Sequence, residues 1–276
     1  GHSANAAYWF DDSTGNWITS TYYMNELPGW VNKFNSKRFI DTLMMKDWNL
    51  LYDISKYDQS TADDNEFEKP LRHEKKPVFP HIYKDQVVKN YYSLRESPYG
   101  NTFTIDFARQ LLLSEQLGKS GQADMLCISL SSTDYIGHKT GPNSLEIQDT
   151  YLRLDKDIES FLNFLDKHGG VGQYLFFLSA DHGAPQVPAF MKANKLPAGS
   201  MKKSILKAEL NTFCYEKFGA KNLVKAIHEY QVYFNYRLID SLKPDMSVIK
   251  KSLVDLLMQK PEVIAAFDYD SFEKVL

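Results

Sequence analysis

The sequence of 276 residues has only two cysteines, no long run of Lys or Arg, and no apolar stretch of membrane-spanning length. Two cysteines, Cys127 and Cys214, are too few for a disulfide framework, and we expect both to be buried free thiols. A net charge of -3 without a basic patch lacks the electrostatic footprint of a nucleic-acid-binding protein. A membrane span needs roughly 18–20 consecutive apolar residues, and no such segment is present. These absences exclude nucleic acid and a bilayer as predicted partners.

The composition that remains is that of a globular protein, with 43% hydrophobic and 24% charged residues. Aromatic residues are abundant at 14% and can either pack an interior or line a substrate cleft. The length allows one large or two modest domains.

Two apolar runs are typical of buried strands, ADMLCISL at 123–130 and YLFFLSA at 174–180. A helical apolar spacing precedes the first run, over 102–118. A long amphipathic helix is predicted between the two runs. Ser144 is its expected N-cap and Gly169 its end.

Alternating helices and nearly all-apolar strands indicate an α/β fold, a mostly parallel sheet with helices on both faces. We expect residues 1–199 to form part of this core, interrupted by a polar, proline-broken loop at 58–90. Residues 200–276 are predicted to form a small α+β subdomain that caps the core. Shorter elements are also predicted: a hairpin around 12–16, helices at 27–35, 204–219 and 246–261, one long or two short strands within 223–240, and a strand at 263–270.

Two short motifs follow the two predicted strands. Asp134 and His138 are spaced so that a helical turn or tight loop directs both side chains to one side. Asp181 and His182 are adjacent, and a turn at Gly183 allows both to approach one ion. Carboxylate and imidazole are ligands of zinc and other divalent first-row metals. Because ligands bind beyond the carboxyl ends of parallel strands, the two motifs together predict a metal centre.

Each motif alone has an ordinary structural explanation. The first can be a helix N-cap aspartate with a surface histidine, and the second a solvated loop. Tyr135 and Lys139, beside the first motif, can wall a phosphate pocket and meet an anionic substrate, or serve only in packing. The other histidines within the chain are expected to be ordinary surface or core residues: His73, His81, His168 and His228.

The segments SLSSTDYIGHKTGPNSLEIQDTYLRLDKDIESFL and FFLSADHGAPQVPAFM resemble the alkaline phosphatase superfamily, in its nucleotide pyrophosphatase/phosphodiesterase-type branch. Within that branch the chain is similar to periplasmic alkaline phosphatases that use a Thr nucleophile and two zinc ions. The similarity extends to AYWFDDSTGNWITSTYYM and SPYGNTFTIDFARQLL, and so covers essentially the whole chain. It implies that Asp134 and His138 bind the first zinc and that Asp181 and His182 bind the second.

The same resemblance implies groups that this sequence does not contain. The family's nucleophilic Thr, a further zinc-binding Asp, a Lys/Arg pair that holds phosphate and a last His ligand have no match here. No catalytic nucleophile is therefore assigned within the chain, and each zinc pair supplies two ligands. We interpret the chain as an internal fragment of a longer enzyme, with a natural degenerate homologue as the alternative.

The predicted function of the parent protein is metal-dependent phosphomonoester hydrolysis, through a covalent phospho-Thr intermediate. A phosphodiesterase or nucleotide pyrophosphatase on the same metal core is the alternative. The isolated chain is expected to be a non-catalytic module. The predicted partners are a phosphate ester substrate and a second copy of the chain, and the resemblance implies export to the periplasm.

Overall fold

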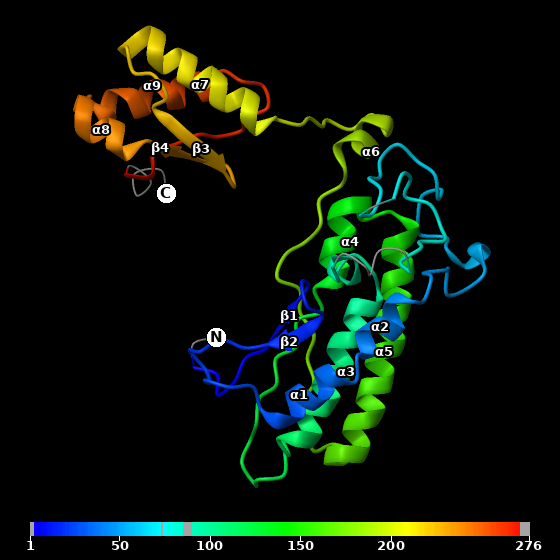
Figure 1. The fold of residues 1–276 in the computed structure, drawn as a ribbon. Coiled ribbons are helices and arrows are strands. Elements are labelled where there is room, and N and C mark those ends of the chain that lie inside the picture. Colours follow the sequence, from blue (N-terminus) through cyan, green and yellow to red (C-terminus); the bar gives the residue numbers. More distant parts are fainter. Residues whose placement is uncertain (1–2, 73, 85–89, 271–276) are drawn as a thin grey trace. The chain divides into compact units, whose positions relative to one another are not determined.

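The computed structural model describes residues 3–72, 74–84 and 90–270 (Figure 1). The chain divides into two compact units, Gly1–Phe190 and Met191–Leu276, each with its own hydrophobic core. The division falls earlier in the chain than the domain boundary that the sequence predicts, after residue 199. Each unit is described by itself below.

The first unit starts with the predicted hairpin, in which β1 (Trp9–Asp11) pairs antiparallel with β2 (Asn16–Ile18). Gly15 in the turn has a φ of 73°, a conformation that favours glycine. A Cβ at Gly15 would lie 2.8 Å from the ring of Tyr91, so the turn also needs glycine for space. The prediction of a hairpin here is confirmed.

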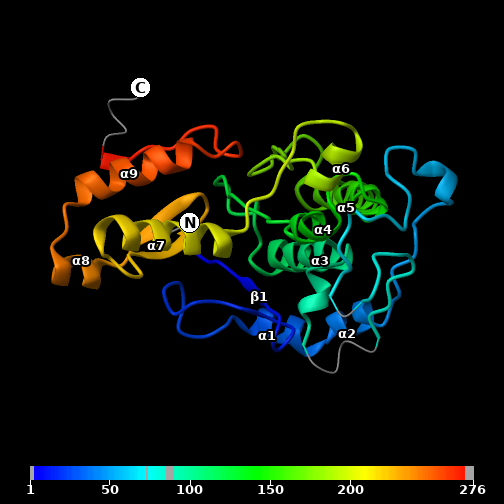
Figure 2. The ribbon, with the colours of Figure 1, turned by 90° about the horizontal axis from the view of Figure 1, so that it is seen from above.

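Helices dominate the rest of the first unit, and α3, α4 and α5 pack against one another (Figures 1 and 2). The helices are α1 (Gly29–Ser36), α2 (Phe39–Met44), α3 (Tyr99–Ser114), α4 (Ser132–Thr140), α5 (Leu145–Gly169) and the start of α6 (Pro188–Ala193), which continues beyond Phe190. Two 3₁₀ turns, η1 (Ile54–Lys56) and η2 (Tyr92–Leu94), lie between α2 and α3. The cap of α5 is as predicted, because the Ser144 hydroxyl accepts a hydrogen bond from the Ile147 amide at 3.1 Å.

Aromatic side chains fill the core of the first unit. Trp17 stacks on Phe107 with ring centroids 4.1 Å apart, and Phe103 and Phe34 pack around this pair. Offset and edge-on contacts of this kind contribute beyond the area that they bury. The high aromatic content thus serves packing, and these rings come from the hairpin, α1 and α3.

The two runs that read as buried strands have no regular secondary structure, at residues 123–130 and 175–180. Met125 is 76% exposed and Leu175 88%. A strand is held by the hydrogen-bond ladder of its neighbours, and no ladder reaches these runs in the described residues. The two sheets found there are two-stranded and antiparallel, so the parallel sheet stays a prediction.

The position of one cysteine follows from this difference. Cys127 lies in the first open run and is exposed, so the prediction of its burial was wrong. Cys214 is buried as a free thiol, as predicted.

The polar loop predicted at 58–90 contains no helix or strand among its described residues. It lies on the junction of α4 and α5: the Thr61 amide donates to the Asn143 carbonyl at 2.7 Å, and the Lys69 amide to the Lys139 carbonyl at 2.9 Å. Near its end, His81 forms an isolated antiparallel bridge with Trp48.

The second unit contains α7 (Lys203–Phe218), β3 (Val224–His228), β4 (Gln231–Phe234), α8 (Tyr236–Leu242) and α9 (Met246–Met258). β3 and β4 form an antiparallel hairpin, which favours two short strands over one long strand within 223–240. The end of that predicted segment, residues 236–240, is helical instead and belongs to α8. Leu210, Leu223 and Ile249 form the buried centre of this unit. The strand predicted at 263–270 is not formed, and Ile264 there is 97% exposed.

Along the described segments 3–72, 74–84 and 90–270, we find no helix with both the length and the apolar character that crossing a bilayer requires.

Candidate metal centre

Helix α4 presents the first predicted ligand pair. Asp134 and His138 lie one helical turn apart, and the His138 Nε2 atom is 3.3 Å from the Asp134 Oδ1 atom. Both side chains are open to solvent, at 72% for His138 and 44% for Asp134. The spacing therefore places both side chains on one helix face, as the sequence predicts.

The second pair comes from the bend that follows residues 175–180. The Nε2 atom of His182 is 3.4 Å from the same Asp134 Oδ1 atom. Asp181 lies at the edge of the group, 93% exposed, with its Oδ1 atom 3.9 Å from His182 Nε2. The fold thus brings both imidazoles onto one carboxylate from segments far apart in the sequence.

The pKa of His182 is raised from its ordinary value. The main cause is the hydrogen bond between His182 Nδ1 and the carbonyl oxygen of Gly183, at 3.0 Å, and the negative charges of Asp181 and Asp134 add to it. When Nδ1 carries the proton of this bond, Nε2 is left as the free ring nitrogen. A backbone carbonyl on one ring nitrogen is the usual support of a metal-binding histidine.

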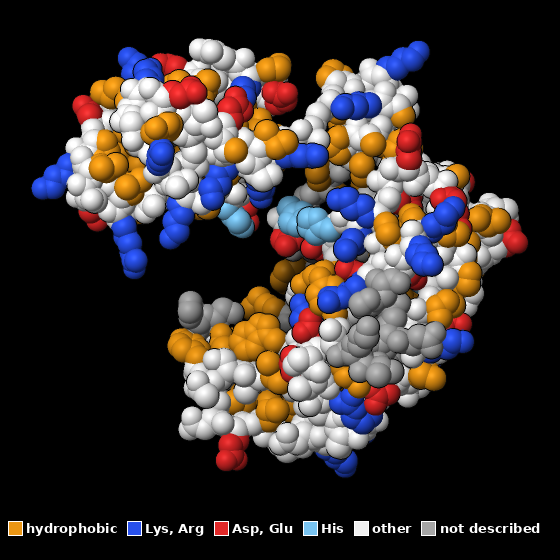
Figure 3. Space-filling view, turned by 45° about the horizontal axis from the view of Figure 1, so that its top comes forward, with side chains coloured by type: hydrophobic (Ala, Val, Ile, Leu, Met, Phe, Trp, Pro, Cys, Tyr) orange, Lys and Arg blue, Asp and Glu red, His pale blue; other side chains and the backbone are white. Residues whose placement is uncertain are grey.

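The donor atoms suit zinc, which takes imidazole nitrogen and carboxylate oxygen in proteins. Exposed histidines lie beside acidic and basic side chains on the face drawn in Figure 3. Within the part of the chain that the structure describes, however, no three His, Cys, Asp or Glu residues are already arranged around a common point that could hold an ion. The imidazoles of His138 and His182 both lie beside the Asp134 carboxylate instead.

Tyr135 and Lys139 are both occupied by protein partners. The Tyr135 hydroxyl accepts a hydrogen bond from Arg95 at 2.9 Å, and the Lys139 ammonium lies 3.5 Å from a Glu96 carboxylate oxygen. These contacts favour the packing interpretation of the two residues over direct contact with substrate.

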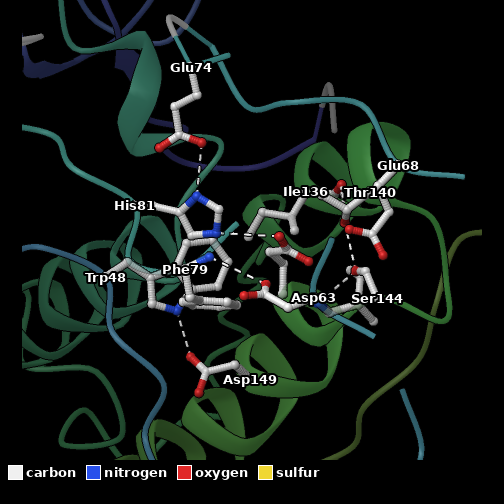
Figure 4. Close-up of polar contacts among 12 residues, drawn as sticks. Trp48, Asp63, Glu68, Glu74, Phe79, His81, Ile136, Thr140, Ser144 and Asp149 are labelled. Carbon is white, nitrogen blue, oxygen red and sulfur yellow. Dashed lines mark hydrogen bonds and ion pairs between the residues drawn. The ribbon is translucent and has the colours of Figure 1, made fainter. Parts of the chain in front are cut away.

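A buried charge cluster that the sequence analysis did not predict lies beneath the polar loop (Figure 4). His81 is fully buried between two carboxylates, with Nδ1 2.9 Å from Glu74 and Nε2 3.3 Å from Glu146. Burial lowers the pKa of His81, but its contacts with Glu146 and Glu74 outweigh burial and raise the pKa to about 9. Burial and the nearby Glu146 raise the pKa of Glu68 to about 8.

A second buried carboxylate, Asp149, anchors the segment after α2. It accepts hydrogen bonds from the Trp48 indole at 2.5 Å and the Leu51 amide at 2.7 Å, and pairs with Arg153 at 2.6 Å. A sequence signal exists for Glu146, because it lies four residues before the buried Thr150 and eight before the buried Leu154 on one face of α5. That spacing predicts an interior position for a charge that also suits the positive end of a helix.

Two of the remaining histidines have ordinary settings: His168 lies 3.0 Å from the Leu117 carbonyl oxygen, and the exposed His228 pairs with Glu229 at 3.7 Å. His81 is a core residue, as expected, but it lies in the buried charge cluster. His73 lies outside the described residues.

Comparison with known proteins defines the class. The sequence pattern of the family "Type I phosphodiesterase / nucleotide pyrophosphatase" matches residues 1–246. The chain belongs to this family.

Within it, the chain is similar to alkaline phosphatases. It is 45% identical over 268 residues to alkaline phosphatase PhoV of Synechococcus elongatus, covering 97% of this chain and 48% of PhoV. It is 42% identical over 272 residues to alkaline phosphatase PafA of Elizabethkingia meningoseptica, covering 98% of this chain and 50% of PafA. A crystal structure of wild-type PafA matches with a TM-score of 0.95 and 41% identity, over 99% of this chain and 52% of that one.

The chain thus spans about half the length of the curated relatives that it matches. The similarity to PafA confirms an alkaline-phosphatase-like α/β fold.

Proposed function

We propose that the protein containing this chain is a metal-dependent phosphomonoester hydrolase. One observation carries the proposal. The Nε2 atoms of His138, on α4, and His182, in a distant bend, both lie within 3.4 Å of the Asp134 Oδ1 atom. The relatives PhoV and PafA, both named alkaline phosphatases, support the choice of a phosphate ester as substrate.

In this proposal Asp134 and His138 would hold one zinc ion, and Asp181 and His182 would hold a second. When bound, such ions would supply charge stabilisation for the attacking and leaving oxygens of an in-line displacement at phosphorus. The protein's own part is to bind the ions by these four side chains and to fix the His182 ring through the Gly183 carbonyl.

The test is hydrolysis of an aryl phosphate monoester by the full-length protein and its variants His138→Ala and Asp181→Ala. We expect each variant to lose activity by about 10²-fold or more, because a group that stabilises the transition-state charge is removed. His228→Ala, an exposed histidine of the second unit, is the matched control. Full activity in both His138→Ala and Asp181→Ala would contradict the proposal.

Metal dependence is tested separately, with a chelator. Treatment of the wild-type protein should abolish hydrolysis, and added zinc should restore it. Activity that survives complete removal of metal contradicts the zinc part of the proposal.

The family description favours one alternative, phosphodiester or nucleotide pyrophosphate hydrolysis on the same four residues. The two functions differ in what contacts the non-transferred oxygens of the phosphate. Comparing kcat/KM for a monoester, a diester and a nucleoside triphosphate decides between them. A preference for the diester or the triphosphate would replace the monoester assignment.

For the chain by itself we propose weak metal binding and no multiple turnover. Each pair supplies two ligands, whereas stable zinc sites have three or four. Elemental analysis after dialysis against zinc tests this, and two retained ions per chain would contradict it.

We also propose that residues 123–130 and 174–180 are strands of a mostly parallel sheet with helices on both faces. The TM-score of 0.95 to PafA supports this, as does the strongly apolar character of both runs. In the same proposal residues 200–276 cap the core, the protein is exported to the periplasm, and a second copy of the chain is a possible partner. Light scattering of the purified protein tests the dimer.

A further inference from the structure

Helix α4 carries two pairs of side chains, and in each pair the two residues lie one helical turn apart. Asp134 and His138 form the first, and Tyr135 and Lys139 form the second. Each residue advances the helix by about 100°, so the second pair lies on the face next to the first. What holds the second pair therefore sets the direction in which the first pair points.

Arg95 holds one member of the second pair. Its Nη1 donates to the Tyr135 hydroxyl at 2.9 Å, and its Nη2 donates to the Phe10 carbonyl oxygen of β1 at 3.2 Å. Its Nε lies 3.4 Å from Asp12. The planar guanidinium fork thus links α4 to the N-terminal hairpin at a fixed angle.

Glu96 holds the other member. Its side chain is 2% exposed, with one oxygen 3.5 Å from the Lys139 ammonium. The other oxygen accepts a hydrogen bond from the Arg72 amide at 2.8 Å. A nearly buried carboxylate needs both partners, so Lys139 is held in place by the cost of leaving Glu96 without its counter-charge.

We infer that Arg95 and Glu96 are positioning residues for the metal-binding face of α4, acting through Tyr135 and Lys139. This inference rests on the proposed metal role of Asp134 and His138. Arg95 and Glu96 are adjacent in the loop just after η2. They contact α4 at two points, Tyr135 and Lys139, which lie one turn apart. Two such points fix the rotation of α4 about its own axis as well as its place.

The geometry sets the size of the effect. A rotation of about 10° moves an atom roughly 6 Å from a helix axis by about 1 Å. Working sites need their groups within roughly 0.5 Å of the productive geometry. Loss of either contact is therefore enough to misplace the ligand pair and to let α4 open locally more often. The unit as a whole stays folded, because α4 is also packed through the fully buried Ile136.

Arg95 is assigned to positioning and not to substrate binding because its guanidinium is already engaged with three protein groups. An arginine that clamps a phosphate needs its fork free for the anion.

The deciding variant is Tyr135→Phe, which removes only the hydroxyl and keeps the ring against Tyr92, at 6.2 Å between centroids. Glu96→Gln is the second variant, since it removes the charge that holds Lys139. Tyr151→Phe, at a 57% exposed position of α5, is the matched control. All are made in the full-length protein.

Two readouts are taken, amide hydrogen exchange of residues 132–140 without metal and the dissociation constant of zinc. In Tyr135→Phe and Glu96→Gln we expect faster exchange confined to α4 and a zinc dissociation constant raised by about 10- to 100-fold. The unfolding midpoint should stay close to wild type, and the control should match wild type in both readouts.

Unchanged exchange, or unchanged zinc affinity in both variants, overturns the inference while leaving the proposed function intact. A wild-type protein that binds no zinc is a different outcome: it overturns the proposed function, and the positioning role with it. The variants could also lose as much free energy of unfolding as they lose free energy of zinc binding. That result would assign Arg95 and Glu96 to stability alone and would overturn the inference.

Discussion

His81 holds two carboxylates in the interior of the first unit and shows how single residues stabilise this fold. Glu74 and Glu146 face its two ring nitrogens at 2.9 and 3.3 Å. Glu146 has no exposed surface, so solvent cannot take the place of the imidazole ring beside it. Removing one partner of a buried pair leaves the other uncompensated, which costs more than the pair itself contributes.

We therefore predict that His81→Gln lowers the free energy of unfolding of the first unit by about 3–5 kcal/mol. Denaturant unfolding at pH 6.5 measures this. His228→Gln, at an exposed histidine paired only with Glu229, should change stability little. An equal loss in both variants would argue against a special role of the buried cluster.

The same histidine predicts how stability varies with pH. Its pKa is raised from 6.5 to about 9 in the folded protein, so the folded state holds this proton more tightly than the unfolded one. The stabilisation is complete below pH 6.5 and is lost as the pH rises through 9, with a span of about 3 kcal/mol. Glu68, with a pKa raised to about 8, acts in the same direction.

Unfolding series at pH 6 and pH 9.5 check this prediction. Wild type should be clearly less stable at the higher pH, and His81→Gln should lose most of that difference. Stability that rises over this range would show that other groups control the pH dependence.

The sequence predicted the four residues of the candidate centre but not the buried cluster. Asp134, His138, Asp181 and His182 form motifs that local spacing makes visible. His81 and Glu74 meet Glu146 only because the polar loop folds over the start of α5, and no local pattern encodes that contact. Contacts between side chains that are far apart in the sequence cannot be predicted from one segment at a time.

At the scale of elements, the sequence predicted α1, α3, α5, α7 and α9 and all four strands of the described residues, but not the short helices α2, α6 and α8. It also predicted three strands that the described residues do not form, at 123–130, 174–180 and 263–270. α5 is specified by its own apolar period and by Ser144, so its position was confirmed. The run 175–180 has the composition of a strand, yet a strand requires a neighbour that its own sequence does not supply. The prediction of the β1–β2 hairpin was confirmed, because each strand finds its pairing partner on the other side of one short turn.

The packing of α3 against α4 gives a prediction at this scale. A Cβ at Gly100 would lie 2.1 Å from the Ser132 hydroxyl and 2.7 Å from the Leu94 carbonyl oxygen. Gly100→Ala should therefore destabilise the protein by about 1–3 kcal/mol, because backbone must move. Thermal unfolding measures the loss.

Gly29→Ala is the control for that variant, because nothing lies within 4 Å of the added Cβ at the start of α1. It should leave stability unchanged or raise it slightly. If Gly100→Ala were as stable as Gly29→Ala, the contact between α3 and α4 would be looser than described.

At the scale of the molecule, two separate cores predict two separate responses. Leu210 is fully buried in the second unit, so Leu210→Ala should lower the stability of that unit by about 2–5 kcal/mol. Amide exchange in α3 and α5 should stay near its wild-type rate. Exchange that accelerates equally in both units would mean that they unfold as one body.

The apolar run at 175–178 has a consequence for the purified chain in solution. Leu175, Phe177 and Leu178 are each more than half exposed, directly before the bend with Asp181 and His182. Exposed apolar segments with strand propensity pair readily with the same segment of another molecule. We therefore expect the purified chain to self-associate as its concentration rises.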